Sequence, residues 1–313
     1  MLEKHFYRFK RKQPNHYRPV ILITGCASGI GHALAERLCA CPEYRVMLTA
    51  REGDSLQRVK TDFPESDTCF AWPLDVTVES SRQAAVAEAL RRWGSVDILI
   101  NNAGISYRAV VEHMTEEDEC RQMSTNYFGP LGLIRAVLPS MRERGRGKII
   151  NVSSVSGMLA MPTMASYSAS KYALEGASEA LWYELKPYGL NISLVQPGFI
   201  HSKSFERVYF SKASHPSNPE GPYSAYYQNM SPFVERMMRW ARATPEKIAE
   251  QVLRVIKTEN PPLWIPATAD AYAFYYLRRF LPRRYLLQVL FHCLPRARKW
   301  GHGFTHRRGQ RQG

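Results

Sequence analysis

Short, continuously apolar runs alternate with helical segments along most of this chain. The apolar runs that predict strands lie at 20–24, 44–50, 69–76, 96–104, 148–154 and 191–198, with a candidate seventh at 262–266. Between them we predict helices near 34–39, after Gly53, and at 79–93, 115–141 and 166–185. Strands covered on both faces are apolar throughout, and parallel strands need helical crossovers. The pattern therefore predicts an α/β fold with a doubly wound parallel sheet.

In such a sheet, ligands bind beyond the carboxyl ends of the strands. The first strand ends in "TGCASGIG", which then opens a helix. Gly25, Gly29 and Gly31 allow a tight turn and a close approach to a pyrophosphate, and the free N–H groups of the helix N-terminus favour an anion. The spacing differs from G-x-G-x-x-G, but the strand–turn–helix context predicts a dinucleotide site.

The second predicted strand ends in Ala50 and Arg51, where folds that prefer NAD place an acidic residue. An arginine at this point accommodates a ribose 2′-phosphate. We therefore predict NADP(H) in preference to NAD(H). The alternative is that Arg51 is a loop residue in solvent.

Taken together, the motifs resemble the short-chain dehydrogenase/reductase family over about residues 20–200, which implies a Rossmann fold. The matching residues are Thr24–Gly31 (T-G-x-x-x-G-x-G), Asp75 in "LDVT", Asn101–Gly104 (N-N-A-G), Asn126, Ser154, Tyr167 and Lys171 (Y-x-x-x-K), and Pro197-Gly198.

The resemblance implies a catalytic set of Asn126, Ser154, Tyr167 and Lys171. Tyr167 would pass a proton to or from the substrate oxygen, which Ser154 would hold by a hydrogen bond. A free phenol has a pKa near 10, which is too high for a base at neutral pH. The positive charge of the Lys171 ammonium would favour the phenolate and so lower that pKa. Lys171 would also hold the nicotinamide ribose, and Asn126 would position a water in a proton relay.

The resemblance also implies a cofactor-binding set that runs along the predicted strand ends. Its members are Thr24, Gly25, Ser28, Gly29, Ile30, Gly31, Arg51, Asp75, Val76, Asn102, Ala103, Gly104, Tyr167, Lys171, Pro197, Gly198, Ile200 and Ser202.

The substrate is expected to be a hydrophobic small molecule. Ser154, Val155, Met161 and Tyr167 are the predicted substrate contacts, and residues 201–243 form a long, aromatic-rich insertion that we interpret as a lid. A loop packed on the body for stability is the alternative. The pattern resembles the branch containing 17β-hydroxysteroid and retinol dehydrogenases, which implies a steroid, retinoid or other lipid-like alcohol or carbonyl. A 3-oxoacyl-type or general carbonyl reductase and a non-catalytic NADP(H)-sensing regulator remain alternatives.

The net charge of +14 is concentrated at the two ends of the chain. We divide the chain into a basic tail at 1–19, an oxidoreductase domain at 20–270, and a basic, partly helical extension at 271–313. Aromatic residues and arginine pairs in the extension predict peripheral attachment to the cytoplasmic face of a membrane. The alternative is a helix packed on the body or at a subunit contact. No nucleic-acid motif accompanies the basic ends.

The six cysteines show neither C-x-x-C pairing nor metal-ligand spacing. We therefore expect a reducing, cytoplasmic compartment and no metal site. The family resemblance also implies a homo-oligomer.

Overall fold

The computed structural model, which describes residues 17–201, 208–215 and 221–300, contains one seven-stranded parallel sheet. The strand order is β3-β2-β1-β4-β5-β6-β7, so the chain starts in the middle and winds outward in both directions. This confirms the predicted doubly wound α/β fold. The strands are β1 (Val20–Thr24), β2 (Arg45–Ala50), β3 (Cys69–Pro73), β4 (Ile98–Asn101), β5 (Gly147–Val152), β6 (Leu190–Gln196) and β7 (Trp264–Pro266).

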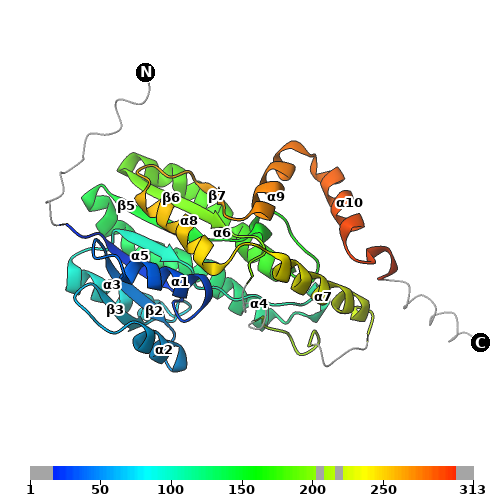
Figure 1. Cartoon of the computed structure of the whole chain (residues 1–313), viewed down its shortest axis with the longest axis horizontal. Coiled ribbons are helices and arrows are strands. Elements are labelled where there is room, and N and C mark those ends of the chain that lie inside the picture. The colour runs from blue at the N-terminus through cyan, green and yellow to red at the C-terminus, as the bar shows by residue number, and fades with distance from the viewer. Residues whose placement is uncertain (1–16, 202–207, 216–220, 301–313) are drawn as a thin grey trace, which may run out of the picture.

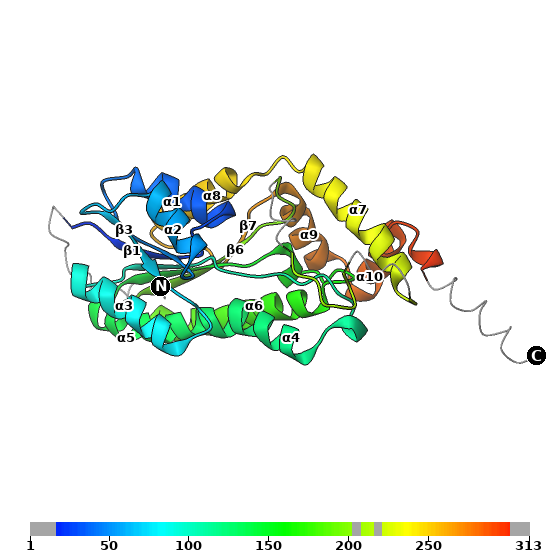
Figure 2. The same cartoon turned by 90° about the horizontal axis from the view of Figure 1, so that it is seen from below.

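Helices cover both faces of the sheet. Figure 2 shows α1, α2 and α8 above it and α3, α4, α5 and α6 below it, while α7, α9 and α10 lie beyond one end (Figures 1 and 2). Successive residues of one strand pack into opposite cores: Ile21 and Ile23 face one side, and Leu22 faces the other. Both faces are buried, which explains the unbroken apolar runs. The helices are α1 (Gly29–Cys39), α2 (Asp54–Asp62), α3 (Glu79–Trp93), α4 (Glu116–Met123), α5 (Gly129–Arg144), α6 (Ala165–Leu185), α7 (Ser224–Trp240), α8 (Pro245–Lys257), α9 (Ala269–Phe280) and α10 (Arg283–Cys293).

The single long helix predicted at 115–141 is divided into three parts. Helix α4 is followed by a π-helical turn (Ser124–Phe128) and then by α5, with Pro130 in the first turn of α5. The chain runs from the π-turn into α5 in helical conformation, with the Gly129 amide bonded to Ser124 O, and Pro130 has no N–H to continue this ladder. π-turns inside helices are frequent at functional sites, and this one contains Asn126.

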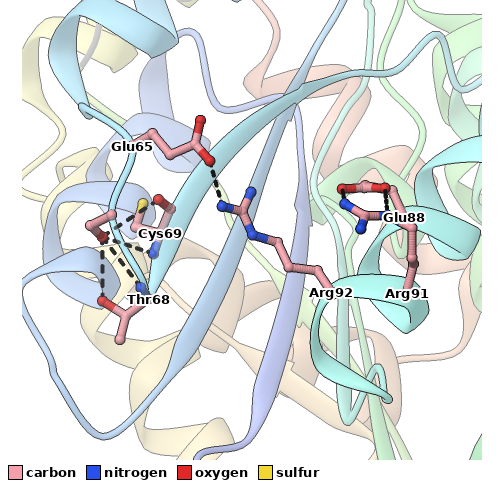
Figure 3. Close-up of polar contacts among 7 residues, drawn as sticks. Glu65, Thr68, Cys69, Glu88, Arg91 and Arg92 are labelled. Carbon is pink, nitrogen blue, oxygen red and sulfur yellow. Dashed lines mark hydrogen bonds and ion pairs between the residues drawn. The ribbon is translucent and has the colours of Figure 1, made fainter.

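The outer strand β3 is packed against α3 at the edge of the sheet (Figure 3). Arg92 of α3 reaches Glu65, in the segment before β3, and its guanidinium lies 4.3 Å from the ring centroid of Phe70. One turn earlier, Glu88 and Arg91 form a two-bond ion pair at 2.6 and 2.7 Å. The side chain of Arg92 thus links α3 to the edge strand β3. Edge strands are often protected by a helix or loop packed on them.

The segment preceding β1 is held by a buried carboxylate. Asp97 Oδ2 accepts hydrogen bonds from the Tyr17 hydroxyl at 2.5 Å, the Val20 amide at 2.9 Å and the Ser95 hydroxyl at 3.0 Å. These contacts fix where the chain enters the central strand of the sheet.

The predicted insertion at 201–243 is not loop throughout, because α7 occupies most of its second half. Met230 and Val234 on α7 pack with Ala297 and Trp300 from the end of the C-terminal extension. Pro282 separates α9 from α10, because proline cannot continue a helix. The predicted boundary at 270/271 falls inside α9. Ser202 and the two basic termini, 1–16 and 301–313, lie outside the described residues.

Candidate active site

A cavity of about 1500 Å³ opens at the carboxyl ends of the strands. Its walls come from the ends of β1, β2, β5 and β6, the loops after β3 and β4, and helices α6 and α7. The structure brings most of the predicted site residues together there, in agreement with the rule for ligand position in such sheets. The predicted residues that line the cavity are Gly25, Ser28, Gly29, Ile30, Arg51, Asp75, Val76, Asn102, Ala103, Gly104, Ser154, Val155, Met161, Tyr167, Lys171, Pro197, Gly198 and Ile200.

Thr24 and Gly31 support the glycine-rich turn from behind. Thr24 Oγ1 accepts hydrogen bonds from the Asn102 and Ala103 amides, both at 2.9 Å. The Asn102 side chain in turn donates to Thr24 O at 2.9 Å and Gly25 O at 3.1 Å. A Cβ at Gly31 would lie 2.1 Å from Gly25 O, so only glycine fits at this position. The turn is thereby fixed with the N-terminus of α1 at the cavity.

The end of β2 presents an edge with charges of both signs beside this turn. Ala50 and Arg51 line the cavity, and Arg58 of α2 joins them. Acidic side chains also lie here, since Asp54 and Asp62 are part of the same wall. Sequence reasoning missed Arg58; its place seven residues after Arg51 was the available signal.

Tyr167 and Lys171 lie one turn apart on α6, with Lys171 Nζ 5.9 Å from the centroid of the tyrosine ring. Burial raises the pKa of Tyr167, while a hydrogen bond with Ser154 and the charge of Arg108 oppose that rise. Burial lowers the pKa of Lys171 to about 8, and the carboxylate of Glu175 opposes that fall. Ser154 and Arg108 therefore keep the pKa of the phenol lower than burial alone would, and Glu175 keeps the pKa of the amine higher than burial alone would.

Asn126 lies behind the cavity wall and does not line it. Its Oδ1 accepts from the Ile105 amide at 2.9 Å, and its Nδ2 donates to Ile105 O at 2.9 Å and to Ser170 Oγ at 3.0 Å. A Cβ at Gly104 would lie 3.3 Å from Asn126 Oδ1 and 3.8 Å from Lys171 Nζ. The π-turn therefore brings this amide to Gly104, which Lys171 also approaches, and joins the loop after β4 to α6.

The loop after β6 is held by the start of α9. Thr268 Oγ1 accepts from the Gly198 amide at 2.9 Å, and Asp270 Oδ2 accepts from the Phe199 amide at 2.9 Å. A Cβ at Gly198 would lie 1.9 Å from Asp270 Oδ2, so this contact requires glycine. Sequence reasoning missed Thr268 and Asp270, which carry no signal beyond the helix-capping pattern of Thr268.

The other half of the cavity is mostly apolar. Val155, Met161 and Met164 line it from the segment between β5 and α6, and Val234 and Met238 line it from α7. Arg108, in the loop after β4, is a cation on this wall that sequence reasoning also missed, because one arginine in a loop carries no distinguishing signal. In the part of the chain that the structure describes, no group of His, Cys, Asp and Glu side chains has the arrangement of a metal site.

Comparison with known proteins agrees with this geometry. The short chain dehydrogenase family model matches residues 19–211. A Drosophila melanogaster protein named dehydrogenase/reductase SDR family protein 7-like is 35% identical over 286 residues, which cover 89% of this chain and 80% of the relative. Homo sapiens 17-beta-hydroxysteroid dehydrogenase type 1 is 31% identical over 274 residues, covering 85% and 79%.

Among solved structures, a short-chain dehydrogenase from Streptomyces avermitilis superposes with a TM-score of 0.73. It is 33% identical, and the match covers 87% of this chain and 96% of that one. The fold, the strand-end cavity and the matched sequences agree, and this chain therefore belongs to the short-chain dehydrogenase/reductase family of oxidoreductases acting on CH–OH groups.

Proposed function

We propose that this protein is an NADP(H)-dependent oxidoreductase that interconverts an alcohol and a carbonyl group on a hydrophobic substrate. The observation that carries the proposal is the position of Ser154, Tyr167 and Lys171 between a glycine-rich turn and an apolar wall of the same cavity. A dinucleotide on one side and a lipid-like molecule on the other would meet at the tyrosine.

The dinucleotide half fits a pyrophosphate because Gly25 and Gly29 bring backbone without side chains to the cavity wall. The close approach at Gly31 and the exposed N-terminus of α1 leave backbone N–H groups for phosphate oxygens. Arg51 and Arg58 on the adjoining edge support a 2′-phosphate, and therefore NADP(H) over NAD(H). When bound, the nicotinamide supplies or accepts the hydride.

The protein's own residues handle the proton. Tyr167 donates its hydroxyl proton to the carbonyl oxygen in the reductive direction and removes a proton from the alcohol in the other. Ser154 donates a hydrogen bond to the same oxygen, and the Lys171 ammonium stabilises the phenolate that remains. Asn126, which approaches Gly104 as Lys171 does, would support the supply of protons to the lysine.

The complete set of polar groups argues against the alternative of a non-catalytic NADP(H) sensor, because binding alone needs no acid–base pair. Among hydrophobic substrates we favour a steroid or another lipid-like alcohol or ketone. The apolar wall from Val155 to α7 supports this class, as does the similarity to a hydroxysteroid dehydrogenase. A 3-oxoacyl-type or general carbonyl reductase is the second candidate.

A turnover panel tests the proposal. Purified protein is assayed with steroids, retinoids, fatty aldehydes and 3-ketoacyl thioesters, each with NADP(H) and NAD(H). We expect the highest kcat/KM for a lipid-like alcohol or ketone with NADP(H). Preference for the thioester would favour the second candidate, and no turnover of any substrate would contradict the proposed function.

We further propose that the C-terminal extension binds the surface of an anionic membrane on its cytoplasmic side. No helix in the described ranges is both long enough and apolar enough to cross a bilayer. Helices α9 and α10 instead expose large apolar side chains, among them Phe280 at 80% and Leu287 at 62%. Arg283 and Arg284, also exposed, lie between these two residues. Aromatic rings and arginines side by side suit the lipid headgroup region.

Co-sedimentation with vesicles tests this surface without removing α9, whose first turn holds the loop after β6. Arg283→Gln with Arg284→Gln should weaken binding to anionic vesicles at low salt by about tenfold or more, since each arginine near such a surface contributes about 1 kcal/mol. The matched control replaces Arg142 and Arg254, which are exposed on other helices. Equal binding by both double variants would contradict a role for the extension.

A homo-oligomer is also part of the proposal, on the basis of family membership. The exposed rings of Phe128 and Tyr183, which lie on the π-turn and α6, are available to a second subunit. Light scattering after size-exclusion chromatography should give a mass above that of one 35.9 kDa chain. A monomer at assay concentrations would contradict this part.

A further inference from the structure

A buried carboxylate lies behind the catalytic pair. Glu175 is on α6, one turn beyond Lys171, and is only 8% exposed. Its Oε1 accepts a hydrogen bond from Ser153 Oγ at 2.7 Å and another from Gln196 Nε2 at 2.9 Å. Ser153 follows β5 and Gln196 ends β6, so the carboxylate joins the catalytic helix to the two strands that form the floor of the cavity.

The absence of a side chain at Gly157 leaves room for the Glu175 carboxylate. A Cβ on Gly157 would lie 2.3 Å from Glu175 Oε1 and 2.9 Å from Ser153 Oγ. Any larger residue at 157 would displace the carboxylate or the serine. The segment that follows Ser154 is thus fitted closely around Glu175.

Two cations act on Glu175 in the described part of the chain. Lys171 lies on the same helix, and Arg278 approaches from α9. From β6 and the end of β5 the carboxylate faces the neutral side chains of Gln196 and Ser153. The guanidinium of Arg278 is also 5.4 Å from the ring centroid of Tyr172, the residue next to Lys171.

Few groups other than Glu175 stabilise the charged form of Lys171. Its ammonium donates to Val152 O at 2.9 Å, and the side chain is 5% exposed. Burial lowers its pKa to about 8, and the charge that counters this fall is that of Glu175. Burial raises the pKa of Glu175, while its two hydrogen-bond donors and the two cations lower it. A lysine whose pKa is close to the working pH is sensitive to the loss of one neighbouring negative charge.

We propose that Glu175 is a positioning residue that keeps the buried Lys171 in its ammonium form, and that Glu175 is itself held in place by Ser153, Gln196 and the room left at Gly157. The proposal rests on the proposed function only in taking Lys171 as the partner of Tyr167. It adds a residue that touches neither substrate nor cofactor and acts through the lysine.

The direct test is the titration of Lys171 in the protein without substrate. Lysine labelled with ¹³C at Cε is followed by NMR against pH, and Lys171→Arg assigns the resonance. Glu175→Gln keeps the shape and the acceptor oxygen but removes the charge. We expect the Lys171 midpoint to fall by about one pH unit or more, since a neighbouring opposite charge shifts a pKa by about 1–3 units.

Glu179→Gln is the matched control, because Glu179 lies one turn further along the same helix and is exposed. It should leave the Lys171 midpoint where it is in the unmodified protein. Equal midpoints in Glu175→Gln, Glu179→Gln and the unmodified protein would overturn the proposal. The alkaline limb of kcat/KM for carbonyl reduction should move to lower pH in Glu175→Gln alone, a change that a purely structural defect would not produce.

A measurement on the unmodified protein removes any dependence on the folding of the variant. Interacting groups titrate together, so the ¹³Cδ signal of Glu175 should show an inflection at the Lys171 midpoint. No such inflection would also overturn the proposal. Both NMR experiments are independent of turnover, so a protein that reduces no carbonyl would refute the proposed function without deciding the role of Glu175.

Discussion

Replacing Gly31 by alanine tests whether the turn after β1 is the dinucleotide cradle. The new Cβ would lie 2.1 Å from Gly25 O and 2.5 Å from Asn102 Nδ2. Neither neighbour can retreat easily, because Asn102 is bonded to Thr24 and Gly25 through its side chain. Overpacking of this kind costs about 1–3 kcal/mol, and loss of the two amide hydrogen bonds adds about 1–3 kcal/mol. The two terms predict a loss of about 2–6 kcal/mol in the free energy of unfolding.

Gly29→Ala is the control for the same turn. Gly29 has a φ of +58° but no atom within 4 Å of an added Cβ, so the cost is that of left-handed backbone alone, about 1–2 kcal/mol. Urea unfolding gives both free energies, and titration of NADPH fluorescence gives the affinity of the folded protein. We expect Gly31→Ala to be the more destabilising change and to weaken NADPH binding by at least about tenfold, a loss of about 1.4 kcal/mol. Equal stability losses in the two variants, or unchanged NADPH affinity in Gly31→Ala, would refute the reasoning.

Two other predictions concern cofactor choice and folding. Arg51→Asp should raise the KM for NADPH about tenfold or more while changing that for NADH much less, because it puts a negative charge beside the 2′-phosphate. Lys60→Asp, on the exposed side of α2, is the charge control, and initial rates that show both variants equal would exclude this role for Arg51. Tyr17→Phe removes the 2.5 Å hydrogen bond to Asp97 and should lower the free energy of unfolding by about 1–3 kcal/mol in urea. The exposed Tyr188→Phe should change it little, and equal effects would contradict the anchoring of the chain at Asp97.

The sequence pattern predicted the sheet well because both faces of it are buried. The central strands are largely apolar on both faces, a signal that needs no knowledge of neighbours. Element ends were less predictable: β3 ends at Pro73 although the predicted run continued to 76. Proline has no N–H to donate to a ladder bond, and Leu74 and Val76 after it are buried in the hydrophobic core without belonging to the strand.

Other features depend on contacts that a single sequence does not display. Helix α7 was predicted as loop, since it contains Pro232 and takes its apolar face from packing with the distant Ala297 and Trp300. The π-turn around Asn126 has no local code. Motif matching located the strand-end residues of the cavity, whereas Arg108 and Glu175 enter the site through tertiary packing, and only the i, i+4 spacing of Glu175 from Lys171 pointed toward it.

The most direct measurement of the central claim is turnover by Tyr167→Phe. This change removes one hydroxyl from the cavity wall and leaves the ring that packs near Lys171. The variant should bind NADPH with an affinity close to that of the unmodified protein and should lose about 10²–10⁴-fold in kcat for the best substrate of the panel, the usual contribution of a general acid–base group. A kcat within about threefold of the unmodified protein, with NADPH binding intact, would contradict the assignment of Tyr167 as the proton donor and acceptor.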